Sequence, residues 1–192
     1  VMYHRYLNIK KEDPKWEDRD RFILSKGHAG IAYAPVLCDF GYNDPEQLKT
    51  FNLTNSKMGI HLDSNKVAGV DASTGSLGHG IPIAAGTAIA ARVLGKDYYT
   101  YVVTGDGELD EGSNWEGLMT IRHYNLTNCI TIVDRNHCMI DGNTEDVMKL
   151  EPLADKFVAF GFHTIVCEGN NIVSLCKAID EAHKTKDKPT VI

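Results

Sequence analysis

The sequence predicts an α/β domain: a parallel sheet with helices on both faces. Three observations support this fold class. Segments of strand-like composition alternate with segments whose apolar residues recur at helical spacing. Cys129–Val133 is almost continuously apolar, which is typical of a parallel strand covered on both sides. The length of 192 residues corresponds to one domain that can bury a substantial core.

The first part of the chain contains a strand-like run, two helical segments and a long irregular stretch. Phe22–Leu24 is short and apolar, and Gly30–Phe40 carries apolar residues at helical spacing. Pro45–Phe51 is predicted as a short helix capped by Asp44. Residues 52–80 are rich in glycine and polar side chains. An irregular stretch of this length is typical of a functional loop.

The rest of the chain alternates helix and strand. Ile81–Leu94 is small or aliphatic on every face, which predicts a helix buried on most sides and ended by Gly95. The following elements are strand Tyr98–Thr104, helix Trp115–Tyr124, strand Cys129–Val133, helix Leu153–Phe160, strand Thr164–Val166, helix Ile172–His183 and a final apolar run. Right-handed crossovers between parallel strands are expected for this order.

Charge and composition limit the classes of function. The net charge is −6, and no run of basic residues is longer than Lys10-Lys11, which argues against nucleic acid or an anionic membrane as partner. The five cysteines form no C-x-x-C pair, as expected of a reduced intracellular chain. No apolar stretch is long enough to span a bilayer, and no secretion signal opens the chain. We therefore expect a cytoplasmic protein whose partners are small molecules or proteins.

Polar motifs follow two of the predicted strands. Gly105-Asp106-Gly107 comes after Tyr98–Thr104, and Asp134-Arg135-Asn136 comes after Cys129–Val133. Ligands of open α/β sheets bind beyond the carboxyl ends of the strands. Carboxylate and amide oxygens suit Mg²⁺, which commonly shares its shell with substrate phosphates, and Gly107 lets the backbone approach a diphosphate. Gly-Asp-Gly alone is a common turn, but the two motifs, one βαβ unit apart, predict a metal-bound diphosphate.

These two motifs resemble the thiamine diphosphate-binding motif, and their surroundings resemble transketolase over essentially the whole chain. The segments that carry the resemblance are Asp20–Ala29, Thr74–Gly80, Gly105–Gly112, Asp134–Asn136 and Met139–Gly142. The run from Gly105 to Gly112, Gly-Asp-Gly-Glu-Leu-Asp-Glu-Gly, is similar to transketolases assembled from two separate polypeptides. The resemblance implies that residues 1–192 are the diphosphate-binding domain, truncated at both ends.

The resemblance also assigns site residues. It implies that the metal is held by Asp106 and Asn136 through their side chains and by Cys138 through its backbone carbonyl. The implied cofactor-binding residues are His28, Gly75, Ser76, Leu77, Gly78, His79, Gly105, Asp106, Gly107, Glu108, Asn136 and Ile140. The implied cofactors are thiamine diphosphate and Mg²⁺, which Ca²⁺ or Mn²⁺ can replace.

Three residues are implied to be catalytic, and two positions keep alternatives open. His28 and His61 are expected to line the channel above the thiazolium, where imidazoles can exchange protons with sugar hydroxyls. Glu111 is expected to face a partner subunit, the alternative being a favourable acid in the first turn of a helix. His79 stands where transketolases generally carry glutamine, and it either contacts the diphosphate or caps a helix.

The implied function is transfer of a two-carbon ketol unit from a ketose phosphate donor to an aldose phosphate acceptor, as in the pentose phosphate pathway. The alternatives are a related ketol transferase with a non-standard sugar substrate and a non-catalytic assembly subunit. No segment resembles the pyrimidine-binding domain, which carries the glutamate that ionises the thiazolium in this family. We therefore expect the partner to be a C-terminal transketolase subunit, in a heterotetramer.

Overall fold

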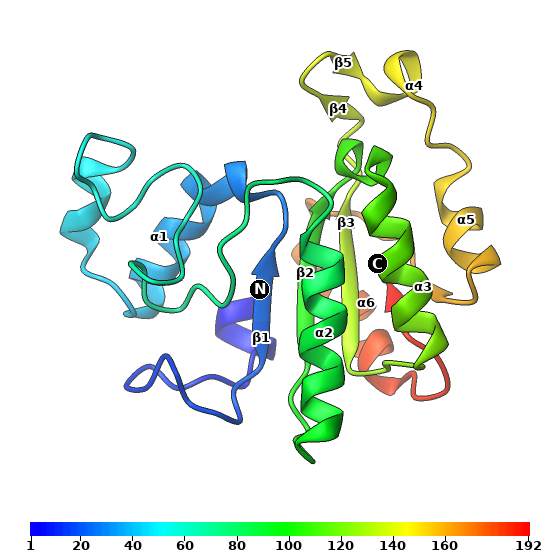
Figure 1. Cartoon of the computed structure of the whole chain (residues 1–192), viewed down its shortest axis with the longest axis horizontal. Coiled ribbons are helices and arrows are strands. Elements are labelled where there is room, and N and C mark those ends of the chain that lie inside the picture. The colour runs from blue at the N-terminus through cyan, green and yellow to red at the C-terminus, as the bar shows by residue number, and fades with distance from the viewer.

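The computed structural model describes residues 1–192 and is built around a five-stranded parallel sheet (Figure 1). The strand order is β1-β2-β3-β7-β6, and every neighbouring pair is parallel. The strands are β1 (Arg21–Leu24), β2 (Thr100–Gly105), β3 (Cys129–Asp134), β6 (His163–Thr164) and β7 (Thr190–Val191). A separate antiparallel pair joins β4 (Cys138–Met139) to β5 (Gly142–Asn143).

Helices cover both faces of the sheet, which confirms the predicted fold class. The helices are α1 (Gly30–Phe40), α2 (Gly80–Val93), α3 (Gly112–His123), α4 (Thr144–Val147), α5 (Leu153–Ala159) and α6 (Ile172–Lys184). Shorter helical turns are η1 (Met2–Tyr6), η2 (Gly27–Ala29), η3 (Pro45–Thr50) and η4 (Gly107–Asp110). Figure 1 shows α2 and α3 in front of the sheet and α6 behind it.

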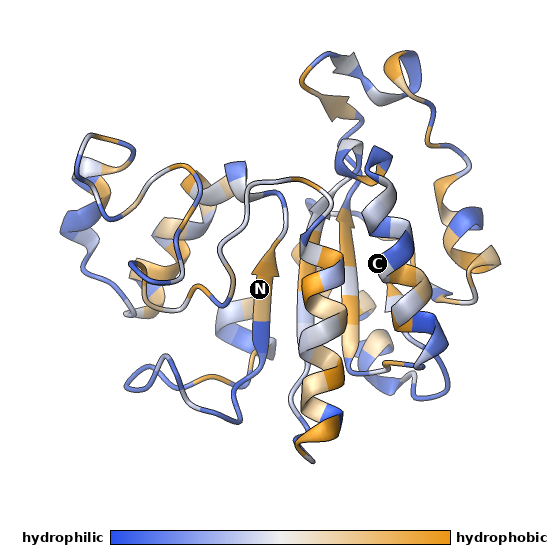
Figure 2. Cartoon of the chain, in the orientation of Figure 1, coloured by the Kyte–Doolittle hydropathy of each residue, from blue (hydrophilic) through white to orange (hydrophobic).

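The core has a layer on each face of the sheet, because successive residues of a strand point to opposite sides. Val102 of β2 packs with buried residues of α2, α3 and α5. Its neighbour Tyr101 packs on the other face with Ile130 of β3 and Ala182 of α6. Figure 2 shows hydrophobic residues along β3 and on α2, between more hydrophilic loops. A further cluster beyond β1 joins α1 to η1 and the long loop.

Most predicted elements are present, but their limits differ in places. α3 begins at Gly112 rather than Trp115, and the strand predicted at Thr164–Val166 is only His163–Thr164. Residues 52–79 contain no helix or strand, as expected. The cap at Asp44 is present, since its side chain accepts a hydrogen bond from the Glu46 N–H at 2.9 Å, although the helix is of the 3₁₀ type.

One prediction about α2 is wrong. Its inner face is buried, but its outer side and C-terminal end are open, with Val93 77% and Leu94 66% exposed. The alanines that made every face look apolar, such as Ala84 and Ala88, serve the close packing of α2 on the sheet. No helix in the chain combines the length and hydropathy that a membrane crossing requires.

Candidate functional site

The carboxyl ends of β2 and β3 bring the two polar motifs together. Gly105 pairs with Asp134 in the sheet, and the N–H of Asp106 donates to the Asp134 carbonyl at 3.2 Å. The parallel register therefore carries Asp106 and Asn136 to the same edge, as the sequence predicts. Asp106 is only 1% exposed, whereas Asn136 lies at the surface.

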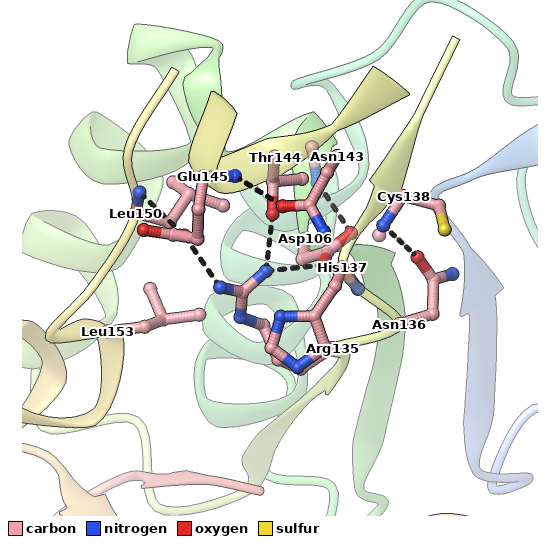
Figure 3. A network of polar contacts seen from close by, with 12 residues as sticks. Asp106, Arg135, Asn136, His137, Cys138, Asn143, Thr144, Glu145, Leu150 and Leu153 are labelled. Carbon is pink, nitrogen blue, oxygen red and sulfur yellow. Dashed lines mark hydrogen bonds and ion pairs between the residues drawn. The ribbon is translucent and has the colours of Figure 1, made fainter. Parts of the chain in front are cut away.

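Three N–H groups fix the carboxylate of Asp106 (Figure 3). Its Oδ1 accepts from the Gly107 N–H at 2.8 Å. Its Oδ2 accepts from the His137 N–H at 2.7 Å and from Arg135 Nη1 at 2.8 Å. A carboxylate has about four acceptor positions, so one remains on Oδ1 for a further ligand.

A second and a third oxygen lie next to Asp106. Asn136 and Cys138 stand beside it in Figure 3, joined by a 2.8 Å bond from the Cys138 N–H to the Asn136 Oδ1. The Cys138 carbonyl lies close to Gly107, at 3.8 Å from where a β-carbon on that glycine would be. One carboxylate, one amide oxygen and one carbonyl form a donor set that fits Mg²⁺. These are the three ligands that the sequence predicts.

The carboxylate of Glu108 is turned into the protein and holds the glycine-rich loop. Glu108 is 3% exposed, and its Oε1 accepts from the Gly78 N–H at 3.0 Å and from the Ser25 hydroxyl. Its Oε2 accepts from the Thr104 hydroxyl at 2.8 Å and from the Gly105 N–H at 3.1 Å. The sequence-based assignment of Glu108 to cofactor binding is therefore better expressed as positioning of Gly78 than as direct contact.

The glycine-rich loop passes close to residues from three other segments. Gly78 has a φ of +88°, and a β-carbon there would be 2.7 Å from the Glu111 β-carbon. Gly75 has a φ of +155°, and a β-carbon there would lie 3.1 Å from the His61 ring. Both positions need glycine because L side chains rarely adopt such backbone angles. The loop therefore has Glu111 on one side and His61 on the other.

His28 and His61 flank this loop at the surface. Gly27, the neighbour of His28, approaches the backbone of Gly75 so closely that an added β-carbon would lie 2.9 Å from its nitrogen. Since His61 also lies over Gly75, the structure brings both histidines to one loop. Both side chains are exposed.

The remaining predicted residues are mostly exposed. Ser76, His79 and Glu111 are exposed, Leu77 is half-buried, and Ile140, beside the β4–β5 turn, is fully exposed. His79 and Glu111 occupy the N-cap positions of α2 and α3, but neither side chain makes a capping hydrogen bond. The geometry therefore does not support the capping alternative for His79.

The sequence analysis missed two cations at this edge. Lys26 forms an ion pair with Asp134, and Arg135 bonds Asp106, Glu145 and Glu151. Burial lowers the pKa of Arg135, but its bonds to Asp106 and Glu151 outweigh burial and raise that pKa above its ordinary value. Arginine between two polar residues of a ligand motif was the available signal.

A cavity of about 680 Å³ lies beside this edge of the sheet. Lys26, Asp134 and Asn136 line it on the side of the motifs, and Phe157 and Cys167 line it further along. Asp106, His28 and His61 are not among its lining residues. The predicted diphosphate site is therefore the exposed groove between the loops rather than this cavity.

A parallel sheet that presents oxygen donors and a glycine-rich loop at its carboxyl edge defines a metal- and diphosphate-binding α/β domain. A family model described as "Transketolase, thiamine diphosphate binding domain" matches residues 1–192. The chain belongs to this family.

Individual relatives agree with the family assignment. The chain is 41% identical to one named subunit of the apulose-4-phosphate transketolase of Actinobacillus succinogenes, over its whole length and 69% of that protein. It is 38% identical to SqwG, which is named as one subunit of the 6-deoxy-6-sulfo-D-fructose transketolase of a Clostridium species, over 70% of that protein. The transketolase structure from Leishmania mexicana matches all of this chain with a TM-score of 0.95 and 38% identity. The chain spans only 30% of that longer protein.

Proposed function

We propose that this chain is the thiamine diphosphate- and Mg²⁺-binding subunit of a two-subunit transketolase. The observation that carries the proposal is the meeting of Asp106, Asn136 and the Cys138 carbonyl beside the glycine-rich loop. Relatives that are themselves named as single subunits of a transketolase support an assembly from separate polypeptides. The partner would be a C-terminal subunit with the pyrimidine-binding domain, in a heterotetramer.

The residues at the strand ends fit the proposed ligands. Asp106, Asn136 and the Cys138 carbonyl would hold the cation, and backbone N–H groups of the loop around Gly75 would face the diphosphate. Ile140 would pack on a ring of the cofactor. When bound, thiamine diphosphate supplies the electron sink that ketol transfer requires.

The two histidines would act on the sugar. His28 and His61 lie over the same glycine-rich loop and are open to solvent, so a substrate hydroxyl can reach them. An imidazole at neutral pH can take a proton from a hydroxyl, return it, or donate a hydrogen bond to a developing alkoxide. Glu111, on the other side of the loop, would face the partner subunit.

A non-standard sugar is the better proposal for the substrate. Relatives that this chain matches over about 70% of their length are named for apulose-4-phosphate and for 6-deoxy-6-sulfo-D-fructose. A single-chain transketolase such as that of Bacillus subtilis is 36% identical and is covered over 30% of its length. These similarities favour a variant ketose donor over the pentose phosphate pathway. Retention of Asp106, Asn136, His28 and His61 argues against a non-catalytic assembly subunit.

The test is a donor screen with the assembled enzyme. This chain is combined with its pyrimidine-domain partner, thiamine diphosphate and Mg²⁺, and is offered xylulose 5-phosphate, apulose 4-phosphate and 6-deoxy-6-sulfofructose. We expect cofactor-dependent ketol transfer from a donor other than xylulose 5-phosphate. Transfer from xylulose 5-phosphate alone would support the pentose phosphate pathway instead, and cofactor binding without any turnover would support an assembly role.

A further inference from the structure

Arg135 uses every donor that it has. Its Nη1 donates to Asp106 Oδ2 at 2.8 Å and to the Thr144 hydroxyl at 2.6 Å. Its Nη2 donates to Glu145 Oε1 at 2.7 Å and to Glu151 Oε1 at 2.9 Å, and its Nε donates to Glu151 at 3.1 Å. A guanidinium has five N–H groups in a rigid fork. All five are therefore committed to side chains of this chain.

The charge balance of this network explains how Asp106 is kept ionised and oriented. Asp106 is buried, and a buried carboxylate is costly unless it is paired and hydrogen-bonded. The Arg135 side chain is 18% exposed, so its charge is screened by water much less than that of a surface arginine. It therefore supplies Asp106 with a fixed positive neighbour that belongs to the protein itself.

The same guanidinium anchors the segment that follows the β4–β5 hairpin. Glu145 accepts from Arg135 and also from the Leu150 N–H at 3.1 Å, while Glu151 accepts from Arg135 and from the Leu153 N–H at 2.8 Å. These bonds tie α4 and the start of α5 to the end of β3, as Figure 3 shows in part.

The hairpin is held from both of its ends. It runs from Cys138 to Asn143 and carries Ile140. At its start, the His137 N–H donates to Asp106. At its far end, the Thr144 N–H donates to the His137 carbonyl at 3.0 Å, and the Thr144 hydroxyl accepts from Arg135. Arg135 therefore controls one metal ligand directly and a second, the Cys138 carbonyl, through the hairpin.

We propose that Arg135 is a positioning residue that sets both Asp106 and the β4–β5 hairpin for the metal-bound cofactor. This inference rests on the proposed function, because it takes Asp106 and Cys138 as metal ligands. Arg135 itself would touch neither the metal nor the sugar. A lysine cannot replace it, since one ammonium cannot reach four side chains in a planar fork.

The test uses the assembled two-subunit enzyme with Arg135→Lys and Arg135→Met. Arg122→Met serves as the matched control, because Arg122 is an exposed arginine bonded to Asn125. The first readout is hydrogen exchange of residues 137–151, which needs neither activity nor cofactor. We expect both Arg135 variants to lose protection in this segment, while β2 and α2 keep theirs and the control is unchanged.

The second readout is the affinity for Mn²⁺ in the presence of thiamine diphosphate, measured by electron paramagnetic resonance. We expect both Arg135 variants to weaken it by roughly 10- to 100-fold, the usual effect of losing a residue that supports a metal ligand. At saturating Mn²⁺ and cofactor, kcat should return close to that of the unmodified enzyme.

Three results would overturn the proposal. They are unchanged exchange of residues 137–151, unchanged Mn²⁺ affinity, and a loss of kcat that saturating cofactor does not restore. Failure of the proposed function itself would look different. In that case the unmodified enzyme would show no cofactor-dependent Mn²⁺ binding, while the exchange result for Arg135 would still hold.

Discussion

The two halves of the candidate site differ in what holds them. Asp106 and Glu108 are 1% and 3% exposed, and donors from this chain fill most of their acceptor positions. We call these two residues the strand-end half. His28, His61 and Ile140 stand at the surface, and we call them the outer half. The strand-end half is fixed by the fold, whereas the outer half offers side chains to a ligand or a partner.

The comparison indicates how the work is divided between subunits. A buried carboxylate with its own donors is ready before any ligand arrives, which lowers the cost of binding a cation. An exposed isoleucine and two exposed histidines become useful only when another surface excludes water around them. We interpret the chain as a preformed diphosphate half-site that depends on a second polypeptide for the reaction.

The largest effect should come from the outer half. His61→Ala in the assembled enzyme should lower kcat by roughly 10²- to 10⁴-fold, the usual contribution of general acid–base catalysis. The free energy of unfolding should change little, because His61 is exposed. His123→Ala, an exposed histidine on α3, is the control for both steady-state kinetics and urea denaturation. Unchanged catalytic efficiency of His61→Ala would remove its proposed role.

The strand-end half should respond in stability. Glu108→Gln should lower the free energy of unfolding by about 2–4 kcal/mol, since each unsatisfied buried donor or acceptor costs about 1–3 kcal/mol. Urea denaturation measures this loss, and Glu116→Gln, an exposed acid on α3, should stay within about 0.5 kcal/mol. If Glu108→Gln were as stable as the control, the carboxylate would not be what holds the loop.

Ile140 separates the two halves more finely. Ile140→Ser should leave stability unchanged, because the side chain is fully exposed in this chain. In the assembled enzyme it should weaken cofactor binding by about 1–2 kcal/mol, the value of burying part of an apolar side chain. Calorimetric titration measures this, with Leu53→Ser as an exposed apolar control. Equal affinities for both variants would mean that Ile140 does not pack on the cofactor.

The smallest effect concerns pH. Hydrogen bonds from the Leu153 N–H and from Arg135 lower the pKa of Glu151. Burial raises the pKa of Glu145, but backbone N–H bonds from Leu150 and Glu151 outweigh it, so that pKa is also lowered. A lowered carboxyl pKa gives stability that is complete above the ordinary value and is lost as pH falls through the lowered one.

The hairpin segment should therefore lose hydrogen-exchange protection below about pH 4.3, the ordinary pKa of glutamate. Residues 137–151 should lose protection before the strands β2 and β3 do. Arg135→Met should remove this difference, because its network is already broken. Equal protection of the segment at pH 6 and pH 4 would contradict the role of these two acids.

The sequence predicted the meeting of Asp106 with Asn136 because parallel strands end at one edge, so local patterns fix this contact. The alternation of strand and helix likewise predicted the sheet. The β4–β5 hairpin was missed because its strands are two residues long, which is too short for any periodicity.

Contacts that depend on side-chain direction were not accessible from the sequence. Arg135 meets Glu145 and Glu151 from ten and sixteen positions further along the chain, and only the folded hairpin brings them together. Glu108 lies in a recognisable motif, but the motif does not say that its carboxylate turns inward. The exposed outer side of α2 was missed because alanine suits both a buried face and an open one.

The most direct test of the half-site account is calorimetric titration of thiamine diphosphate with Mg²⁺. The titration is made into this chain alone, into the chain with its partner, and into the Asp106→Ala assembly. We predict strong binding only for the unmodified assembly, with little binding to the chain alone and none that depends on Mg²⁺ in the variant. Equally tight binding to the isolated chain, or unchanged Mg²⁺-dependent binding to Asp106→Ala, would contradict the account.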